Sequence, residues 1–143
     1  MDDICLDHFI DAQNVDLEQV VAELAAGKKR SHWIWYIFPQ IAELGYSEKA
    51  KYYGVKTLEE AEAFISHPTL SANYLTCLDT LQLHTDQSIS NILGGIDSRK
   101  FNSSLTLFKG ASKNELVLNK IQGSLERFFG GEECHVTLKF LSS

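Results

Sequence analysis

The stretch TLEEAEAFISHPTLSANYLTCLDTL, residues 57–81, carries the signals of two successive helices. Thr57 to Glu60 matches a capping box, in which both side chains satisfy free N–H groups at a helix start. Pro68 suits the first turn of a second helix, because an N–H at that position would have no helical partner. One stripe of this helix is formed by Leu70, Tyr74, Leu78 and Leu81. We therefore predict two antiparallel helices joined by a tight turn.

Apolar residues recur at helical spacing on both sides of this stretch. Before it, Asn14 or Asp16 can cap a helix that ends at Gly27. After it, Asp97 can cap a helix that ends near Gly110, and a further helix ends at the glycine pair 130–131. The apolar faces of these helices are formed by Leu17, Val20, Val21 and Leu24, by Phe101, Leu105 and Phe108, and by Leu116, Leu118, Ile121, Leu125 and Phe128. Helices therefore dominate the prediction.

The C-terminal segment HVTLKFL, residues 135–141, alternates between polar and apolar residues and fits either a strand or a last helical turn. We favour a short helix, because a single strand would have no partner. The prediction is an all-α fold, a compact irregular multihelical domain of about six to eight short helices. A chain of 143 residues leaves no room for a second core, so residues 1–143 are expected to form one domain.

Charge and hydropathy exclude several classes of function. Lys and Arg number 13 against 19 Asp and Glu, and a net charge of −6 disfavours binding to nucleic acid or to an anionic membrane. The longest apolar run, Trp33 to Phe38, is far shorter than the roughly 20 residues that span a bilayer. The N-terminal MDDICLDHFID is acidic where a secretory signal is basic. We expect a cytoplasmic protein without a nucleic-acid or membrane partner, and we favour a monomer.

The cysteines and histidines show no metal-binding spacing. The three cysteines are odd in number and widely spaced, which predicts reduced thiols in packing roles. None of the five histidines belongs to an H-x-x-x-H or H-E-x-x-H motif, and His67 is expected to cap the turn before Pro68. The sequence also lacks the phosphate-binding motifs G-x-x-x-x-G-K-[ST] and G-x-G-x-x-G. We predict no metal and no cofactor.

Residues 28–40, KKRSHWIWYIFPQ, concentrate aromatic side chains between a basic triplet and a proline. If Ser31 caps a helix that runs to Phe38, steps of about 100° divide the segment into two sides. One side, with Trp33, Ile34, Ile37 and Phe38, is expected in the core. The other side, with His32, Trp35 and Tyr36, carries polar atoms that need partners, and is the better candidate for a pocket wall.

The basic triplet Lys28, Lys29 and Arg30 has two interpretations. The cations can complement the dipole of the preceding helix and remain solvated. Alternatively, Arg30 and His32 can flank the free N–H groups of a helix that begins at Ser31 and form a site for phosphate or carboxylate. The sequence leaves both open.

The segment DSRKFNSSLTLF, residues 97–108, places Asp97, Phe101, Ser104 and Phe108 on the inner side of a helix. Lys100 lies at the border of that side, one turn before Ser104. A lysine beside a serine is a possible nucleophile arrangement. The alternative is that Ser103 and Ser104 are small packing residues, while Lys100 extends outward. No residue is assigned a catalytic role.

Five motifs together resemble one family. They are KRSHWIWYIFPQ, LGYSEKAKYYGV, the His-Pro of ISHPTL, the D-x-x-K-x-x-S-S-x-T-L-F pattern, and the FFGG near the end. The sequence resembles domain-of-unknown-function family 1810 (DUF1810), sometimes mislabelled as calpastatin, from about His8 to about Leu141. The resemblance implies a compact multihelical single domain, often a stand-alone bacterial protein. It implies no reaction.

The preferred hypothesis is a domain that binds a small anionic ligand, such as a phosphate or nucleotide, where residues 31–40 meet residues 97–108. Whether it is also an enzyme stays open. The candidate ligand-binding residues are Arg30, His32, Trp35, Tyr36, Gln40, Lys100 and Ser104. One alternative is that the aromatic segment is purely structural and that function lies elsewhere. The other is a protein interaction module that uses an aromatic surface.

Overall fold

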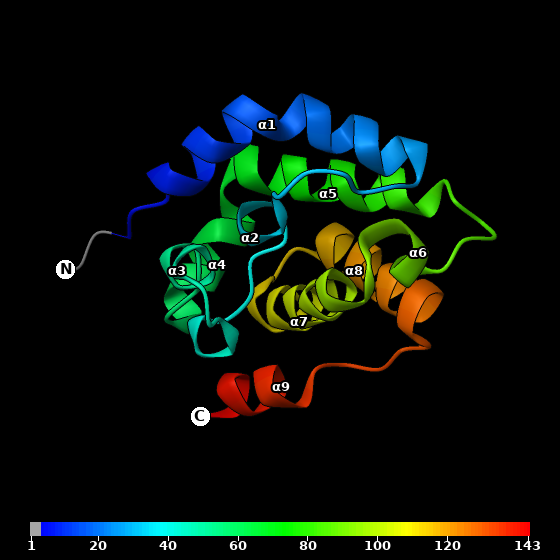
Figure 1. Ribbon diagram of the computed structural model, residues 1–143. Coiled ribbons are helices and arrows are strands. Elements are labelled where there is room, and N and C mark those ends of the chain that lie inside the picture. The colour runs from blue at the N-terminus through cyan, green and yellow to red at the C-terminus, as the bar shows by residue number, and fades with distance from the viewer. Residues whose placement is uncertain (1–3) are drawn as a thin grey trace.

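The computed structural model describes residues 4–143, and this part of the chain forms nine α-helices and one 3-10 helix (Figure 1). In chain order they are α1 (Asp7–Ala26), α2 (Ile34–Ile37), η1 (Ala42–Leu44), α3 (Glu48–Tyr52), α4 (Leu58–Ser66), α5 (Pro68–Gln82), α6 (Ile89–Leu93), α7 (Gly95–Ala111), α8 (Glu115–Phe129) and α9 (His135–Ser142). The all-α prediction is confirmed, and the expected six to eight helices correspond to the six with more than five residues. Asp2 and Asp3, used in the argument about a secretory signal, lie outside the described residues.

Local capping explains the end of α1 and the starts of α4 and α5, as the sequence predicted. The Thr57 hydroxyl accepts a hydrogen bond from the N–H of Glu60 at 3.1 Å and so caps α4. His67 separates α4 from α5, and its Nδ1 accepts from the first N–H groups of α5, which begins at Pro68. Gly27 ends α1 in a left-handed conformation with φ of 78°, which glycine adopts without strain.

Two of the predicted starts of the long helices are wrong. The first helix begins at Asp7 instead of near Leu17, because Phe9 and Gln13 are buried and extend its contact with the core. The helix α7 follows Gly94 directly, so Asp97 lies within its first turn and is not its cap. The C-terminal segment is a helix, α9, as predicted.

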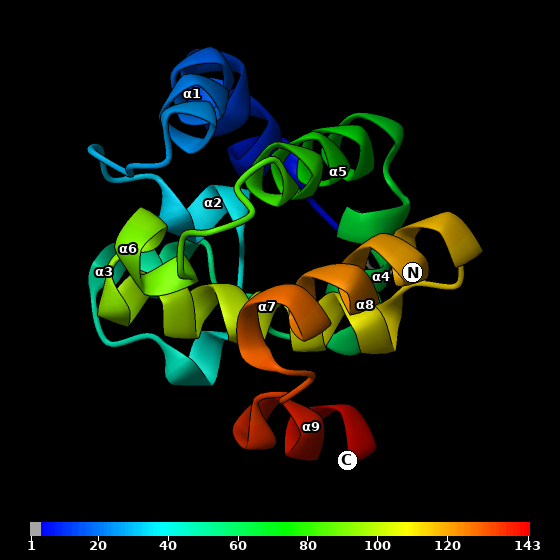
Figure 2. The ribbon, with the colours of Figure 1, turned by 90° about the vertical axis from the view of Figure 1, so that its right-hand side faces the viewer.

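The helix α7 runs through the centre of the molecule and contacts α4, α6, α8 and α9 (Figures 1 and 2). The long helices α1 and α5 lie side by side, and α2 contacts both α1 and α7. Buried aromatic rings join these layers: Phe38 packs against Phe101 at 4.5 Å between ring centroids, and Phe64 packs against Phe108 at 5.0 Å. This packing holds the segment after α2 against α7. Across residues 4–143, no helix is both long enough and apolar enough to span a membrane.

Candidate functional site beside Trp35

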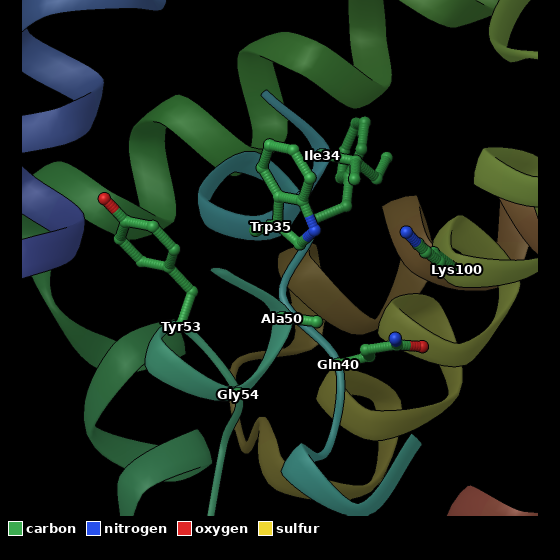
Figure 3. A pocket seen from close by; sticks show the side chains of 8 residues that line it. Ile34, Trp35, Gln40, Ala50, Tyr53, Gly54 and Lys100 are labelled. Carbon is green, nitrogen blue, oxygen red and sulfur yellow. The ribbon is translucent and has the colours of Figure 1, made fainter. Parts of the chain in front are cut away.

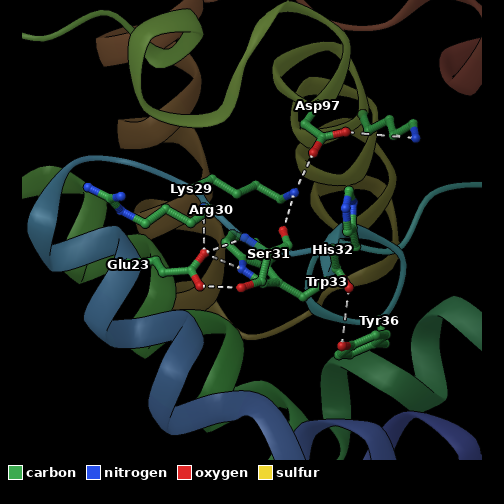
Figure 4. A network of polar contacts seen from close by, with 9 residues as sticks. Glu23, Lys29, Arg30, Ser31, His32, Trp33, Tyr36 and Asp97 are labelled. Carbon is green, nitrogen blue, oxygen red and sulfur yellow. Dashed lines mark hydrogen bonds and ion pairs between the residues drawn. The ribbon is translucent and has the colours of Figure 1, made fainter.

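The buried carboxylate of Glu23, on α1, holds the connection between α1 and α2 (Figure 4). Its Oε1 accepts hydrogen bonds from the N–H groups of Arg30 at 2.7 Å and Ser31 at 3.0 Å, and from the indole of Trp33 at 3.0 Å. Its Oε2 accepts from the Ser31 hydroxyl at 2.7 Å and from the Gln19 amide at 3.0 Å. One carboxylate thus accepts five hydrogen bonds, four from Arg30, Ser31 and Trp33 and one from Gln19 on α1.

These bonds set the ionisation of Glu23. Burial alone raises the pKa of its carboxyl, but the hydrogen bonds from Arg30, Ser31 and Trp33 favour the charged form and lower the pKa to about 2. The prediction that Ser31 caps a helix is therefore wrong, because its hydroxyl and N–H are both bound to Glu23 and α2 begins only at Ile34. The N–H groups proposed for an external anion already bind a carboxylate of the protein itself.

Four residues of the aromatic segment are buried as predicted, namely Trp33, Ile34, Ile37 and Phe38. Tyr36, predicted for the pocket wall, is also buried and points toward α1. Its hydroxyl donates a hydrogen bond to the carboxylate of Asp16, and its ring packs against Tyr53. Because α2 has a single turn between α1 and α7, Tyr36 falls on the α1 side and does not line the recess described next.

A recess opens beside Trp35, between α2, the segment around α3 and the side of α7 (Figure 3). Its lining residues are Ile34, Trp35, Phe38, Gln40, Ala50, Tyr53, Gly54 and Lys100. The enclosed space is about 10 Å³, enough for roughly one water molecule. Trp35 and Gln40 therefore meet Lys100 from a distant part of the chain, and all three were predicted.

Two backbone hydrogen bonds build the side of the recess formed by residues 40–55. The N–H of Val55 donates to the carbonyl of Gln40 at 2.9 Å, and the N–H of Ala42 donates to the carbonyl of Val55 at 2.8 Å. This close crossing requires a glycine at position 54, because a Cβ there would lie 2.6 Å from the Cα of Ala42. The pairing fixes Gln40 beside the recess.

Two cations lie near the indole of Trp35. The ammonium of Lys49 is 5.2 Å and that of Lys100 is 5.7 Å from its ring centroid, distances at which cations are attracted to the aromatic face. Lys100 also lies 3.8 Å from the carboxylate of Asp97. The indole nitrogen is buried and finds no acceptor among the described residues, and it lies on the side of the ring turned toward Lys100 and Gln40 (Figure 3).

The structure does not bring Ser104 to this recess. Its side chain is 0% exposed, and its hydroxyl shares a hydrogen bond of 2.9 Å with the hydroxyl of Tyr74. A hydroxyl enclosed in the core has no side from which a substrate can approach. The hypothesis that Lys100 and Ser104 form a nucleophile pair is therefore wrong, and the alternative, a packing role for the serine, describes what is found.

The remaining predicted residues lie at or beyond the rim. His32 is exposed, and its ring stacks on Trp35 at 6.5 Å between centroids. Arg30 is exposed, its side chain extends away from His32, and only its backbone joins the Glu23 network (Figure 4). Lys29, by contrast, is held against α7 by an ion pair of 2.8 Å with Asp97. Lys49 was not predicted, and nothing in the spacing of its segment distinguishes it from Lys51.

No cluster of three or more potential metal ligands forms anywhere in residues 4–143. The three cysteines are free thiols: Cys5 is exposed, Cys134 half-buried and Cys77 buried. Burial raises the pKa of the Cys77 thiol to about 12. That thiol therefore stays protonated near neutral pH and is unreactive, which agrees with the packing role predicted from the sequence.

Comparisons with known proteins confirm the resemblance inferred from the motifs. The sequence model of a family described as "Protein of unknown function (DUF1810)" matches residues 3–141. The crystal structure of the conserved hypothetical protein Rv1873 from Mycobacterium tuberculosis is similar, with a TM-score of 0.93 and 36% sequence identity. The similarity covers 99% of this chain and 99% of that chain. No curated protein matches the sequence significantly.

Proposed function

Because the chain belongs to the DUF1810 family of proteins of unknown function, its membership supplies no reaction, and we propose a function from the geometry. The recess beside Trp35 binds the anionic group of a small molecule, such as a phosphate or nucleotide. The observation that carries this proposal is the buried indole N–H of Trp35, which finds no acceptor among the described residues and adjoins the recess.

An oxygen atom placed in the recess would meet three complementary groups. The N–H of Trp35 would donate a hydrogen bond to it, which would relieve the cost of about 1–3 kcal/mol typical of an unpaired buried donor. The ammonium of Lys100 lines the same space, and the amide of Gln40 offers a further donor. A neutral acceptor would satisfy the indole, but the adjacent lysine favours an oxygen that carries negative charge.

The alternative of an interaction module that uses the aromatic segment is not favoured. Trp33 is 1% exposed, and Tyr36 and Phe38 are buried as well. Only Trp35 and His32 reach the surface, which is too little for the contiguous aromatic patch that such a module presents.

A thermal-unfolding titration with inorganic phosphate tests the proposal, with sodium chloride at matched ionic strength as the reference. At tenfold excess over Kd, a specific ligand stabilises the folded state by about 1.4 kcal/mol, which raises Tm by a few degrees. Lys100→Met keeps the aliphatic stem and should reduce this shift. Trp35→Phe removes the N–H donor and should weaken binding by about tenfold or more.

Lys139→Met is the matched control, because Lys139 is exposed on α9 and does not line the recess. It should respond to phosphate as the wild-type protein does. Equal shifts in phosphate and in sodium chloride, or an unchanged phosphate response in Lys100→Met, would overturn the proposal.

A further inference from the structure

The size of the recess limits what it can hold. A space of about 10 Å³ admits roughly one oxygen atom, whereas sites for organic ligands usually measure about 300–1,000 Å³. Only the end of a ligand therefore enters between Trp35 and Lys100. The rest of the molecule must lie on the neighbouring surface.

Two wider clefts lie around α3. Tyr53 lines both the recess and a cleft of about 430 Å³, which it shares with Glu48, Lys49 and Tyr52. Glu48 and Tyr52 in turn line a third cleft of about 820 Å³ beside the first turn of α1. These shared residues place the three hollows one after another around α3, and we call this series of hollows the α3 path. It leads from the two lysines at Trp35 to the start of α1.

Tyr52 offers an aromatic platform on this path. Its side chain is 61% exposed, although its ring forms T-shaped pairs with His8 at 5.3 Å and with Tyr53 at 4.9 Å between centroids. His8 and Tyr53 also stack on each other, with 17° between their planes. A ring supported in this way keeps an accessible surface while it loses little freedom on binding, which suits stacking with a flat ligand.

The charges along the α3 path give a ligand one orientation. The outer cleft is lined by four carboxylates and two lysines, so its formal charge is negative: Asp7, Asp11, Glu48 and Glu60 against Lys51 and Lys56. An anionic group is repelled there and attracted to Lys49 and Lys100 at the other end. Carboxylates instead accept hydrogen bonds from hydroxyl and amino groups. The path therefore suits a molecule with one anionic end and an uncharged, hydrogen-bonding remainder.

We infer, building on the proposed anion site, that the ligand is a nucleoside monophosphate or a close chemical relative. A phosphate oxygen occupies the recess at Trp35 and Lys100. The sugar lies along the cleft formed by Glu48, Lys49 and Tyr53, and the base stacks on Tyr52 with its amino groups toward the carboxylates of the outer cleft. A polynucleotide fits poorly, because its following phosphates would meet those carboxylates.

Calorimetric titration of the full chain with three kinds of probe tests this inference: inorganic phosphate, ribose 5-phosphate and the four common nucleoside 5′-monophosphates. At least one nucleotide should bind about tenfold more tightly than ribose 5-phosphate, the ratio expected for one stacked base. Tyr52→Ala should remove most of this ratio and leave the affinity for ribose 5-phosphate within about twofold. Tyr46→Ala is the matched control, because Tyr46 is 93% exposed and lines none of the three hollows.

The outcomes separate this inference from the proposed function. If phosphate and ribose 5-phosphate bind and depend on Lys100, but no nucleotide binds more tightly, the anion site stands and the nucleotide inference is wrong. The same holds if Tyr52→Ala leaves the ratio unchanged while circular dichroism shows the variant to be folded. If no probe binds, or if Lys100→Met binds all of them as the wild-type does, both proposals fall.

Discussion

Neutralising Glu23 should cost the protein a large part of its stability at neutral pH. Glu23→Gln preserves the size of the side chain but replaces one of two acceptor oxygens, which together receive five hydrogen bonds, with a donor. The pKa of Glu23 is lowered from 4.5 to about 2, and at about 1.4 kcal/mol per pKa unit this difference corresponds to about 3 kcal/mol. We expect the free energy of unfolding to fall by that order.

The pH dependence follows from the direction of the shift. A carboxyl with a lower pKa in the folded state stabilises that state fully at a pH above its unfolded pKa of 4.5. This contribution is lost as the pH falls toward about 2, where folded Glu23 takes up its proton. The difference between wild type and Glu23→Gln should therefore be largest near neutral pH and should narrow progressively below about pH 4.5.

Urea unfolding followed by far-UV circular dichroism, from about pH 7 down to about pH 3, measures this difference. Glu18→Gln is the control, because Glu18 is an exposed glutamate of the same helix, and it should leave stability within about 0.5 kcal/mol of wild type. The reasoning fails if Glu23→Gln is as stable as wild type near neutral pH. It also fails if the loss of stability is the same at every pH.

Two further substitutions test the recess and the core separately. Gly54→Ala places a methyl group 2.6 Å from the Cα of Ala42, so urea unfolding should show a free energy of unfolding lower by about 2 kcal/mol. The phosphate-induced rise in Tm should also become smaller. If the substitution changes neither quantity, the close crossing of residues 42 and 54 is contradicted. Tyr74→Phe leaves the buried Ser104 hydroxyl without its partner and should cost about 1–3 kcal/mol, of which adding Ser104→Ala should recover part. Neither Tyr74→Phe nor the double variant with Ser104→Ala should change the rise in Tm that phosphate causes. A change would indicate that Ser104 contributes to the binding site.

The predicted helix ends that proved correct share one property. At Thr57, His67 and Gly27, the groups that satisfy the free backbone N–H and C=O groups lie within a few residues along the chain. Such helix ends can therefore be predicted from the local sequence alone. The burial of Trp33 and Ile37 was equally accessible, because large apolar side chains seldom have a better location than the core.

The incorrect predictions concern residues whose partners come from other elements. Ser31 has the side chain of a helix cap, but Glu23 on the preceding helix takes its hydroxyl and its N–H. Asp97 has the same potential, yet its carboxylate pairs with Lys29 from the connection between α1 and α2. Lys49 reaches Trp35 only because residues 40 and 55 pair and bring α3 alongside. The spacing of residues within one segment does not predict such contacts between different segments.

The two tryptophans of the aromatic segment, two positions apart, differ in whether the chain itself provides an acceptor for the buried indole N–H. The indole N–H of Trp33 is satisfied by Glu23, a carboxylate that the protein supplies itself. The indole N–H of Trp35 is buried too, but none of the described residues accepts from it. Folded proteins satisfy the great majority of their buried polar groups, and this exception near two lysines is the reason why we propose an external partner here. The acceptor expected there has the same chemistry as the one Glu23 provides to Trp33, an anionic oxygen.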